Sequence, residues 1–328
     1  MIARLRRFLP LLRAGLAIGL SAGALLLALR QVSPAALHQA FTQADVSWVL
    51  LALASVAANT FCKALRWQVL CAAPGGAIPF GRYLGALLAG QALNLLYPAR
   101  LGDLLRAQAI GEQGPGAAFV LGTLVAEKTL DLLAYGLLLA SALVLVPQPA
   151  WLGVSLSALA LAALVLAAIF AVIVLRADRL FAFLPRLGAS RPERFSRWLA
   201  THLQRGLAGL AVLRHGHTLP ALLGLTALAW GTAVLNNQLV FHALGLHLPP
   251  LAALLLLVAL QAGISLPALP GSMGVFEYTC VLVLALWQVG PETAFAYGVL
   301  LHALVMLPGV LLGLVYLWRW GWLSRSVR

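Results

Sequence analysis

Long apolar stretches alternate with short polar or basic stretches along this chain. Apolar runs of about 20 residues or more suit helices that cross roughly 30 Å of hydrocarbon. They predict helices over residues 10–29, 46–71, 117–146, 151–175, 219–244 and 293–317. The pattern therefore predicts an all-α polytopic integral membrane protein with about 6 full transmembrane helices.

Two further pairs of apolar pieces are each too short to cross a membrane, because a helix of about 13 residues is only roughly 20 Å long. The pairs are residues 84–96 with 103–111 and residues 251–266 with 275–289. A Pro/Gly break separates the members of each pair, at Tyr97–Gly102 and at Pro267–Gly274. Each pair predicts a broken or re-entrant helical hairpin.

The two breaks share a spacing, since Pro98-x-x-x-Gly102 matches Pro270-x-x-x-Gly274. If the basic loops stay in the cytoplasm, the first hairpin enters from the cytoplasm and the second from outside. Opposite entry predicts an inverted repeat, with halves 46–146 and 219–317 joined by residues 147–218 within a single transmembrane domain, 1–328. Paired interrupted segments of this kind point to a transport site.

The composition excludes a large soluble domain. Of 328 residues, 62% are hydrophobic and 9% charged, and the mean hydropathy is +0.96. A soluble domain averages about 25% charged residues. The net charge is +13, and the basic residues lie beside apolar stretches. This placement suits membrane orientation and anionic lipid head groups as partners, rather than nucleic acid.

Residues 176–219 are the longest polar stretch, with eight arginines and only Asp178 and Glu193 as acids. Because positively charged loops resist export, we expect this loop and both termini in the cytoplasm. Helical spacing also predicts an amphipathic helix at the membrane interface. The residues with this spacing are Phe195, Trp198, Leu199, His202 and Leu203.

No pattern in the chain predicts a metal site, a cofactor or a hydrolase site. Cys62, Cys71 and Cys280 are scattered and form no CxxC pair, so neither a metal site nor a disulfide framework is indicated. We therefore expect no cofactor and no catalytic residue of a familiar type.

The first break carries charges that are costly at membrane depth and so tend to face protein or a water-filled cavity. Arg100, Asp103 and Arg106 are spaced three apart, and helical spacing places Asp103 and Arg106 on one face. We expect the two arginines to bind an anionic group bidentately, and the pattern also predicts that Asn94 lines the same site. The alternative is an interfacial loop with snorkelling arginines.

Three charges lie deep in the helix predicted over 117–146. Glu127 and Asp131 are four residues apart and face the same way, and Lys128 is next to the first of them. The two carboxylates need partners, for which Lys128, Arg100 and Arg106 are candidates. Their role is either charge balance or proton coupling in transport, or a structural ion pair.

Glu277 directly follows the second break and is distant from other acids in the sequence. It could pair with an arginine of the first hairpin, or titrate during transport. The alternative is an ordinary charge at a helix N-terminus.

Three ordered motifs resemble those of the flippase-like membrane family that includes the transmembrane part of lysylphosphatidylglycerol synthases. They consist of Asn94, Pro98, Arg100, Gly102, Asp103 and Arg106; then Glu127, Lys128 and Asp131; then Pro267, Pro270, Gly271, Gly274 and Glu277. The chain has Lys128 where the family usually has Arg, and Ser272 where it usually has a second Gly. The resemblance covers about residues 48–317.

The resemblance implies a helical membrane protein that moves or handles a lipid with a polar, often phosphorylated head. The soluble aminoacyltransferase domain of the synthases is absent from the sequence, so we expect a transporter rather than an enzyme. We expect a multi-pass protein of the bacterial inner membrane that translocates an anionic phospholipid or polyprenyl-phosphate lipid. The alternatives are a membrane-embedded enzyme that modifies a lipid head group, and a non-catalytic partner of lipid or envelope biosynthesis enzymes.

Overall fold

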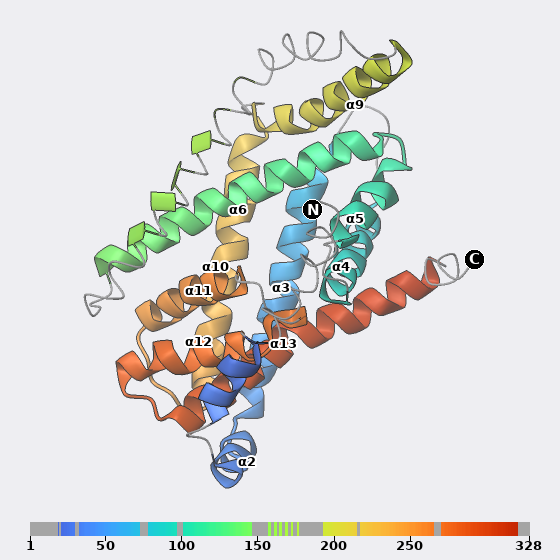
Figure 1. Cartoon of the computed structure of the whole chain (residues 1–328). Helices are drawn as coiled ribbons and strands as arrows, with labels where there is room; N and C mark the ends of the chain where they lie inside the picture. Colours follow the sequence, from blue (N-terminus) through green and yellow to red (C-terminus); the bar gives the residue numbers. More distant parts are fainter. Residues whose placement is uncertain are drawn as a thin grey trace, which may run out of the picture. The chain divides into compact units, whose positions relative to one another are not determined.

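The structure is a computed structural model, and the part of it that can be described is helical with no β-strand (Figure 1). The described residues are 19, 21–29, 33–72, 78–96, 101–145, 193–214, 217–265 and 270–320, with isolated residues between 157 and 176. Over these residues the prediction of an all-α chain is confirmed.

Four helices are long and apolar enough to cross a membrane. They are α3 (Val46–Leu70), α6 (Ala117–Leu145), α10 (Leu219–Ala243) and α13 (Pro291–Arg319). Their ends agree with the predicted spans to within about two residues, because each apolar run stops at a polar or helix-breaking residue. Of the other two predicted spans, residues 21–29 are helical, and 151–175 lies mostly outside the described residues.

Short helices occupy both interrupted regions, as predicted. They are α4 (Phe80–Leu96), α5 (Leu101–Gly111), α11 (Pro250–Ile264) and α12 (Val275–Leu284), with the 3-10 turns η2 (Pro270–Ser272) and η3 (Ala285–Trp287). The predicted start of α4 at Leu84 is wrong. The helix begins four residues earlier, because the exposed Arg82 does not interrupt it and its N–H donates to Pro79 O.

Glycines allow α4 and α5 to lie side by side (Figure 1). A Cβ atom on Gly102 would lie 1.9 Å from Gly90 O, so the two backbones are as close as they can be. The Gly102 N–H donates to Asn94 Oδ1 at 2.8 Å, which ties the start of α5 to the end of α4. The first break thus brings two short helices into contact.

The second break uses the left-handed backbone conformation. Gly271 has φ 76°, Ser272 φ 57° and Gly274 φ 84°. Two of these positions are glycine, which adopts positive φ without the steric cost of a side chain. The turn ends where α12 begins, and α12 packs against α11.

Residues 30–47 were predicted as a polar connection, and this prediction is wrong in part. Residues 34–42 form the helix α2 (Pro34–Thr42). Pro34 is the first residue of the helix, where its fixed φ is favourable and its missing N–H costs nothing. The predicted amphipathic helix is confirmed as a helix, α9 (Glu193–Ala211), followed by η1 (Val212–Arg214).

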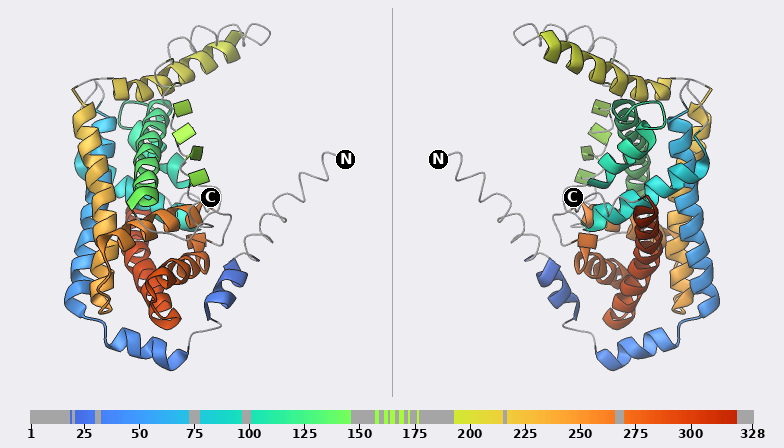
Figure 2. Two further views of the ribbon diagram at one scale, coloured as in Figure 1. Left: turned by 90° about the vertical axis from the view of Figure 1, so that its left-hand side faces the viewer. Right: turned by 90° about the vertical axis from the view of Figure 1, so that its right-hand side faces the viewer.

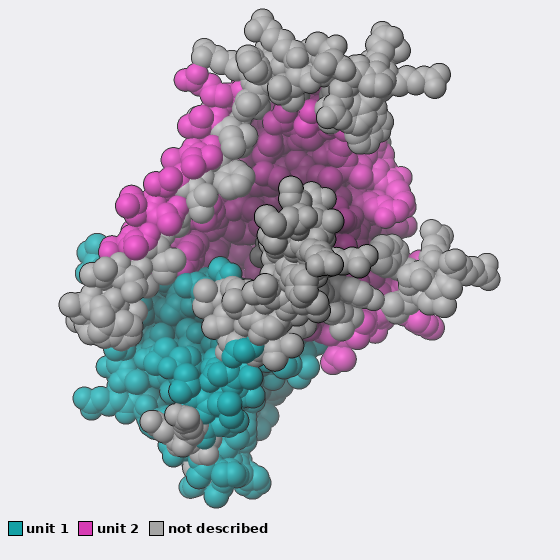
Figure 3. All heavy atoms as spheres, in the orientation of Figure 1, with its two compact units in different colours: residues 1–57, 141–153, 231–308 teal, residues 58–140, 154–230, 309–328 magenta. Residues whose placement is uncertain are grey.

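The chain divides into two compact units (Figure 3). Unit 1 comprises residues 1–57, 141–153 and 231–308, and unit 2 comprises residues 58–140, 154–230 and 309–328. Each long helix contributes residues to both units, and Figure 2 shows these helices from two further sides. The predicted repeat halves do not follow this division, and the inverted repeat stays a prediction.

Candidate functional site

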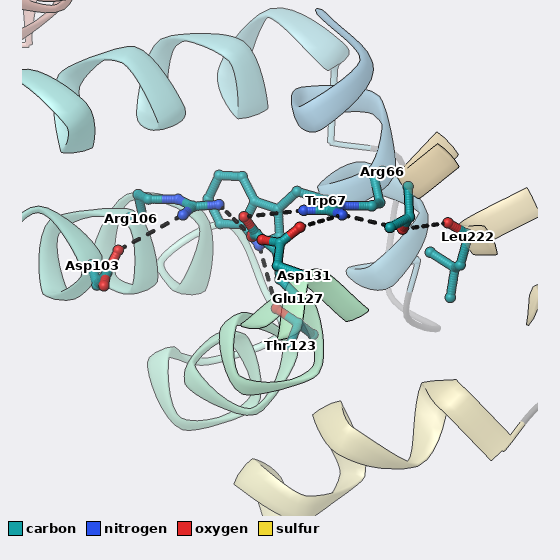
Figure 4. Close-up of polar contacts among 9 residues, drawn as sticks. Arg66, Trp67, Asp103, Arg106, Thr123, Glu127, Asp131 and Leu222 are labelled. Atoms are coloured by element: carbon teal, nitrogen blue, oxygen red, sulfur yellow. Dashed lines mark hydrogen bonds and ion pairs between the residues drawn. The ribbon is translucent and has the colours of Figure 1, made fainter. Parts of the chain in front are cut away.

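Five charged side chains of unit 2 meet in a buried group that we call the arginine cluster (Figure 4). Helix α3 provides Arg66, α5 provides Asp103 and Arg106, and α6 provides Glu127 and Asp131. Three helices therefore meet at one polar site.

Glu127 links the two arginines. Arg106 Nη2 donates to Glu127 Oε2 at 2.7 Å, and Arg66 Nη2 lies 3.7 Å from Glu127 Oε1. At the ends of the cluster, Arg66 Nη1 donates to Asp131 Oδ1 at 2.7 Å, and Arg106 Nη1 lies 3.7 Å from Asp103 Oδ1. The cluster is a chain of alternating charges with Glu127 at its centre.

Burial divides the cluster into an inner and an outer part. The side chains of Arg66, Arg106 and Glu127 are 0%, 5% and 5% exposed. The outer carboxylates of Asp103 and Asp131 are 30% and 27% exposed. An incoming group would therefore meet the two aspartates before it met the guanidiniums.

Trp67 holds Arg106 in place. The Arg106 Cζ atom lies 4.2 Å from the centroid of the Trp67 ring, a cation–π contact. Trp67 Nε1 donates to Thr123 Oγ1 at 3.3 Å, and the Trp67 ring meets Tyr83 edge-on at 5.3 Å. These contacts orient the guanidinium plane and limit its freedom to move.

Both arginines keep unused hydrogen-bond donors. Arg66 Nε, Arg66 Nη2 and Arg106 Nε are buried and have no hydrogen-bond acceptor among the described residues. A guanidinium presents five N–H donors, and a buried donor without an acceptor is costly. The cluster is thus able to donate to a further anion.

Glu277 lies in unit 1 and forms a second buried group. Its Oε2 accepts from the Gly274 N–H at 2.7 Å, and its Oε1 lies 2.6 Å from His302 Nδ1. Among the described residues it pairs with a histidine of α13, and an arginine of the first hairpin is not among its recorded partners. Asn236 and Asn237 of α10 are also buried in this unit.

The structure brings together Arg106, Asp103, Glu127 and Asp131, as the sequence predicted. Asn94 instead bonds the backbone at Gly102, and Lys128 is exposed on α6. Some predicted site residues are not placed: Pro98, Arg100 and Pro267 lie outside the described residues, as does the side chain of Pro270.

The sequence analysis missed Arg66. It placed this residue near a membrane interface, but Arg66 is fully buried and pairs with Asp131. The available signal was that Glu127 and Asp131 needed more than one cation, and that Arg66 precedes Trp67 inside an apolar run. His302 was likewise predicted as a core or interface residue, and its contact with Glu277 was missed.

The sequence profile of the lysylphosphatidylglycerol synthase transmembrane region matches residues 14–313 of the chain. The chain belongs to this family. Comparison with curated proteins gives no match, and comparison with solved structures gives none either. Membership of the lysylphosphatidylglycerol synthase transmembrane-region family makes this chain a multi-pass membrane protein related to lipid metabolism or lipid handling.

Proposed function

We propose that this protein is a lipid transporter of flippase type, and that the arginine cluster binds the anionic head of its substrate. The observation that carries the proposal is the pair of buried guanidiniums with three N–H-bearing nitrogens that lack an acceptor among the described residues. Phosphate oxygens fit such donors well, because a guanidinium binds them bidentately.

Charge balance indicates how an anion enters the cluster. The two guanidiniums face three carboxylates, so one carboxylate withdraws when a phosphate arrives. The partly exposed Asp103 and Asp131 can turn toward water, whereas the buried Glu127 stays between the arginines. Lys63 and Lys128 interact electrostatically with Glu127 and add positive charge nearby.

Transport without chemical change fits this cluster better than catalysis does. The carboxylates of Glu127 and Asp131 accept from guanidiniums, so they balance charge instead of standing free as an acid and a base. The acyl or prenyl tails would stay in the bilayer, and only the head would enter the cluster. Partners in lipid or envelope biosynthesis would supply or use the lipid, which we place in a bacterial inner membrane.

The first prediction tests head-group binding with Arg106→Lys. Lysine keeps the charge but loses the planar contact with Trp67 and the bidentate geometry. We expect transport of an anionic fluorescent phospholipid in proteoliposomes to fall about tenfold or more, since a charged hydrogen bond contributes about 1.5–3 kcal/mol. The matched control is Arg82→Lys, an exposed arginine of α4 that should keep the wild-type rate.

Two outcomes would count against this proposal. Wild-type transport by folded Arg106→Lys protein would show that the arginine cluster is not the head-group site. Conversion of a labelled lipid into a new chemical species by the purified wild-type protein would instead favour a membrane-embedded enzyme.

The second prediction concerns orientation, which we propose from charge: residues 176–219 and both termini are cytoplasmic. Single cysteines introduced into this stretch should resist an impermeant thiol reagent added to whole cells. The background would lack Cys62, Cys71 and Cys280. A cysteine at the exposed Gln39 of α2, on the opposite predicted side, should react. Labelling within 176–219 in intact cells would reverse the proposed orientation.

A further inference from the structure

A buried acid–histidine pair in unit 1 lies at the end of the second break. Glu277 Oε1 and His302 Nδ1 are 2.6 Å apart, and both side chains are 9% exposed. The other carboxylate oxygen of Glu277 accepts from the Gly274 N–H at 2.7 Å. The pair therefore joins three parts of unit 1: α12, α13 and the turn before α12.

The surroundings hold this pair tightly. The His302 ring stacks on Phe276 with centroids 4.4 Å apart. A Cβ atom on Gly298 would lie 3.0 Å from Glu277 Cα, so α13 approaches α12 closely at this level. A Cβ atom on Gly274 would lie 2.3 Å from Ser21 O. The two polar groups are thus packed on several sides.

Few other ionisable groups surround Glu277. From α13 it faces His302, and Tyr297 lies near Cys280. On α12 itself the neighbour is Cys280. The two other elements packed here, α11 and residues 21–29, contain no ionisable side chain in their sequences. Among the described residues, charge at this place is therefore decided by Glu277 and His302 together.

Protonation of the pair changes its net charge. With a carboxylate on Glu277 and a neutral imidazole that donates from Nδ1, the pair carries one negative charge in a site of low polarity. The N-terminus of α12 offsets part of the cost, since Glu277 lies in its first turn. One added proton makes the pair neutral and removes the remaining cost of a buried charge.

We propose that Glu277 and His302 form a binding site for a single proton, whose occupancy sets the strength of the hydrogen bond that closes the second break. The proton comes from hydronium in bulk water and is shared by the carboxylate and the imidazole, with no other bond made or broken. With the proton absent, the Gly274 N–H donates to an anionic carboxylate. Hydrogen bonds to ionised acceptors are roughly twice as strong as neutral ones, so a proton on the carboxyl loosens the turn.

This inference concerns unit 1 alone and does not depend on which lipid the protein handles. It gives a chemical role to His302, and it names the proton as the ligand of a site outside the arginine cluster. It also relates proton binding to Gly271–Gly274, a backbone held at positive φ.

The test follows both groups directly in purified full-length protein. Histidine labelled with nitrogen-15 reports the charge of His302 by NMR, assigned by its loss in His302→Gln, and infrared difference spectra report the carboxyl of Glu277. We expect both signals to change over one shared pH interval between about 5 and 8. In Glu277→Gln the interval of His302 should move by about one pH unit or more. The control Glu292→Gln, in the first turn of α13, should leave it in place.

Hydrogen exchange at the Gly274 amide supplies the second readout. In the wild-type protein, protection of this amide should fall as the pair takes up its proton, beyond the intrinsic effect of pH on exchange. In Glu277→Gln that additional pH dependence should vanish. If neither His302 nor Glu277 changes charge between about pH 5 and 8 in the folded wild-type protein, the proposal is wrong. This reading needs no variant to fold.

Discussion

Glu127→Gln is expected to be the most destabilising conservative substitution in the arginine cluster. Two buried guanidiniums share the carboxylate of Glu127, and an amide offers them no charge and only one acceptor oxygen. Removal of one partner of a buried ion pair costs about 3–5 kcal/mol, because the remaining charge is left uncompensated. Thermal unfolding of the detergent-solubilised protein should show a clear fall in Tm, and lipid transport should be lost.

Asp103→Asn provides the matched control. The Asp103 carboxylate lies 3.7 Å from the same arginine and is 30% exposed. Exposed ion pairs of this kind contribute about 0–1 kcal/mol, so the free energy of unfolding should change little. If Glu127→Gln unfolded at the wild-type temperature, Glu127 would not be the central group that its contacts indicate.

Gly102→Ala is expected to separate α4 from α5. The new Cβ atom would lie 1.9 Å from Gly90 O and 2.7 Å from Asn94 Oδ1, and the first of these atoms is backbone that cannot rotate away. Overpacking of this kind costs about 1–3 kcal/mol or more. Because α5 carries Arg106, the guanidinium would also move away from Glu127. A shift in α5 should appear as faster hydrogen exchange in residues 101–111, together with loss of lipid transport.

Gly81→Ala is the control for this substitution, since it lies in α4 and a Cβ atom there meets nothing within 4 Å. Alanine favours a helix over glycine by about 1 kcal/mol, so this variant should be as stable as the wild type or slightly more so. Unchanged exchange and full transport by Gly102→Ala would show that the close contact between α4 and α5 is not needed for the site.

The sequence by itself determined which segments are helical and which are interrupted. Helices α3, α6, α10 and α13 follow from apolar runs of membrane-spanning length, since a helix satisfies its own backbone groups in lipid. The breaks followed from proline and glycine between short apolar pieces. The neighbouring charges Asp103 and Arg106 also followed, because helical periodicity places residues three apart on one face.

Only the tertiary structure decided which charges pair. Arg66 and Asp131 are 65 residues apart, and Glu277 and His302 are 25 apart. Periodicity gives the face of a helix that a residue occupies, but not the helix that this face meets. That choice depends on close backbone contacts such as Gly102 with Gly90, and on the need of each buried charge for a partner. For this reason Arg66 read as an interfacial arginine in the sequence but lies inside the arginine cluster in the fold.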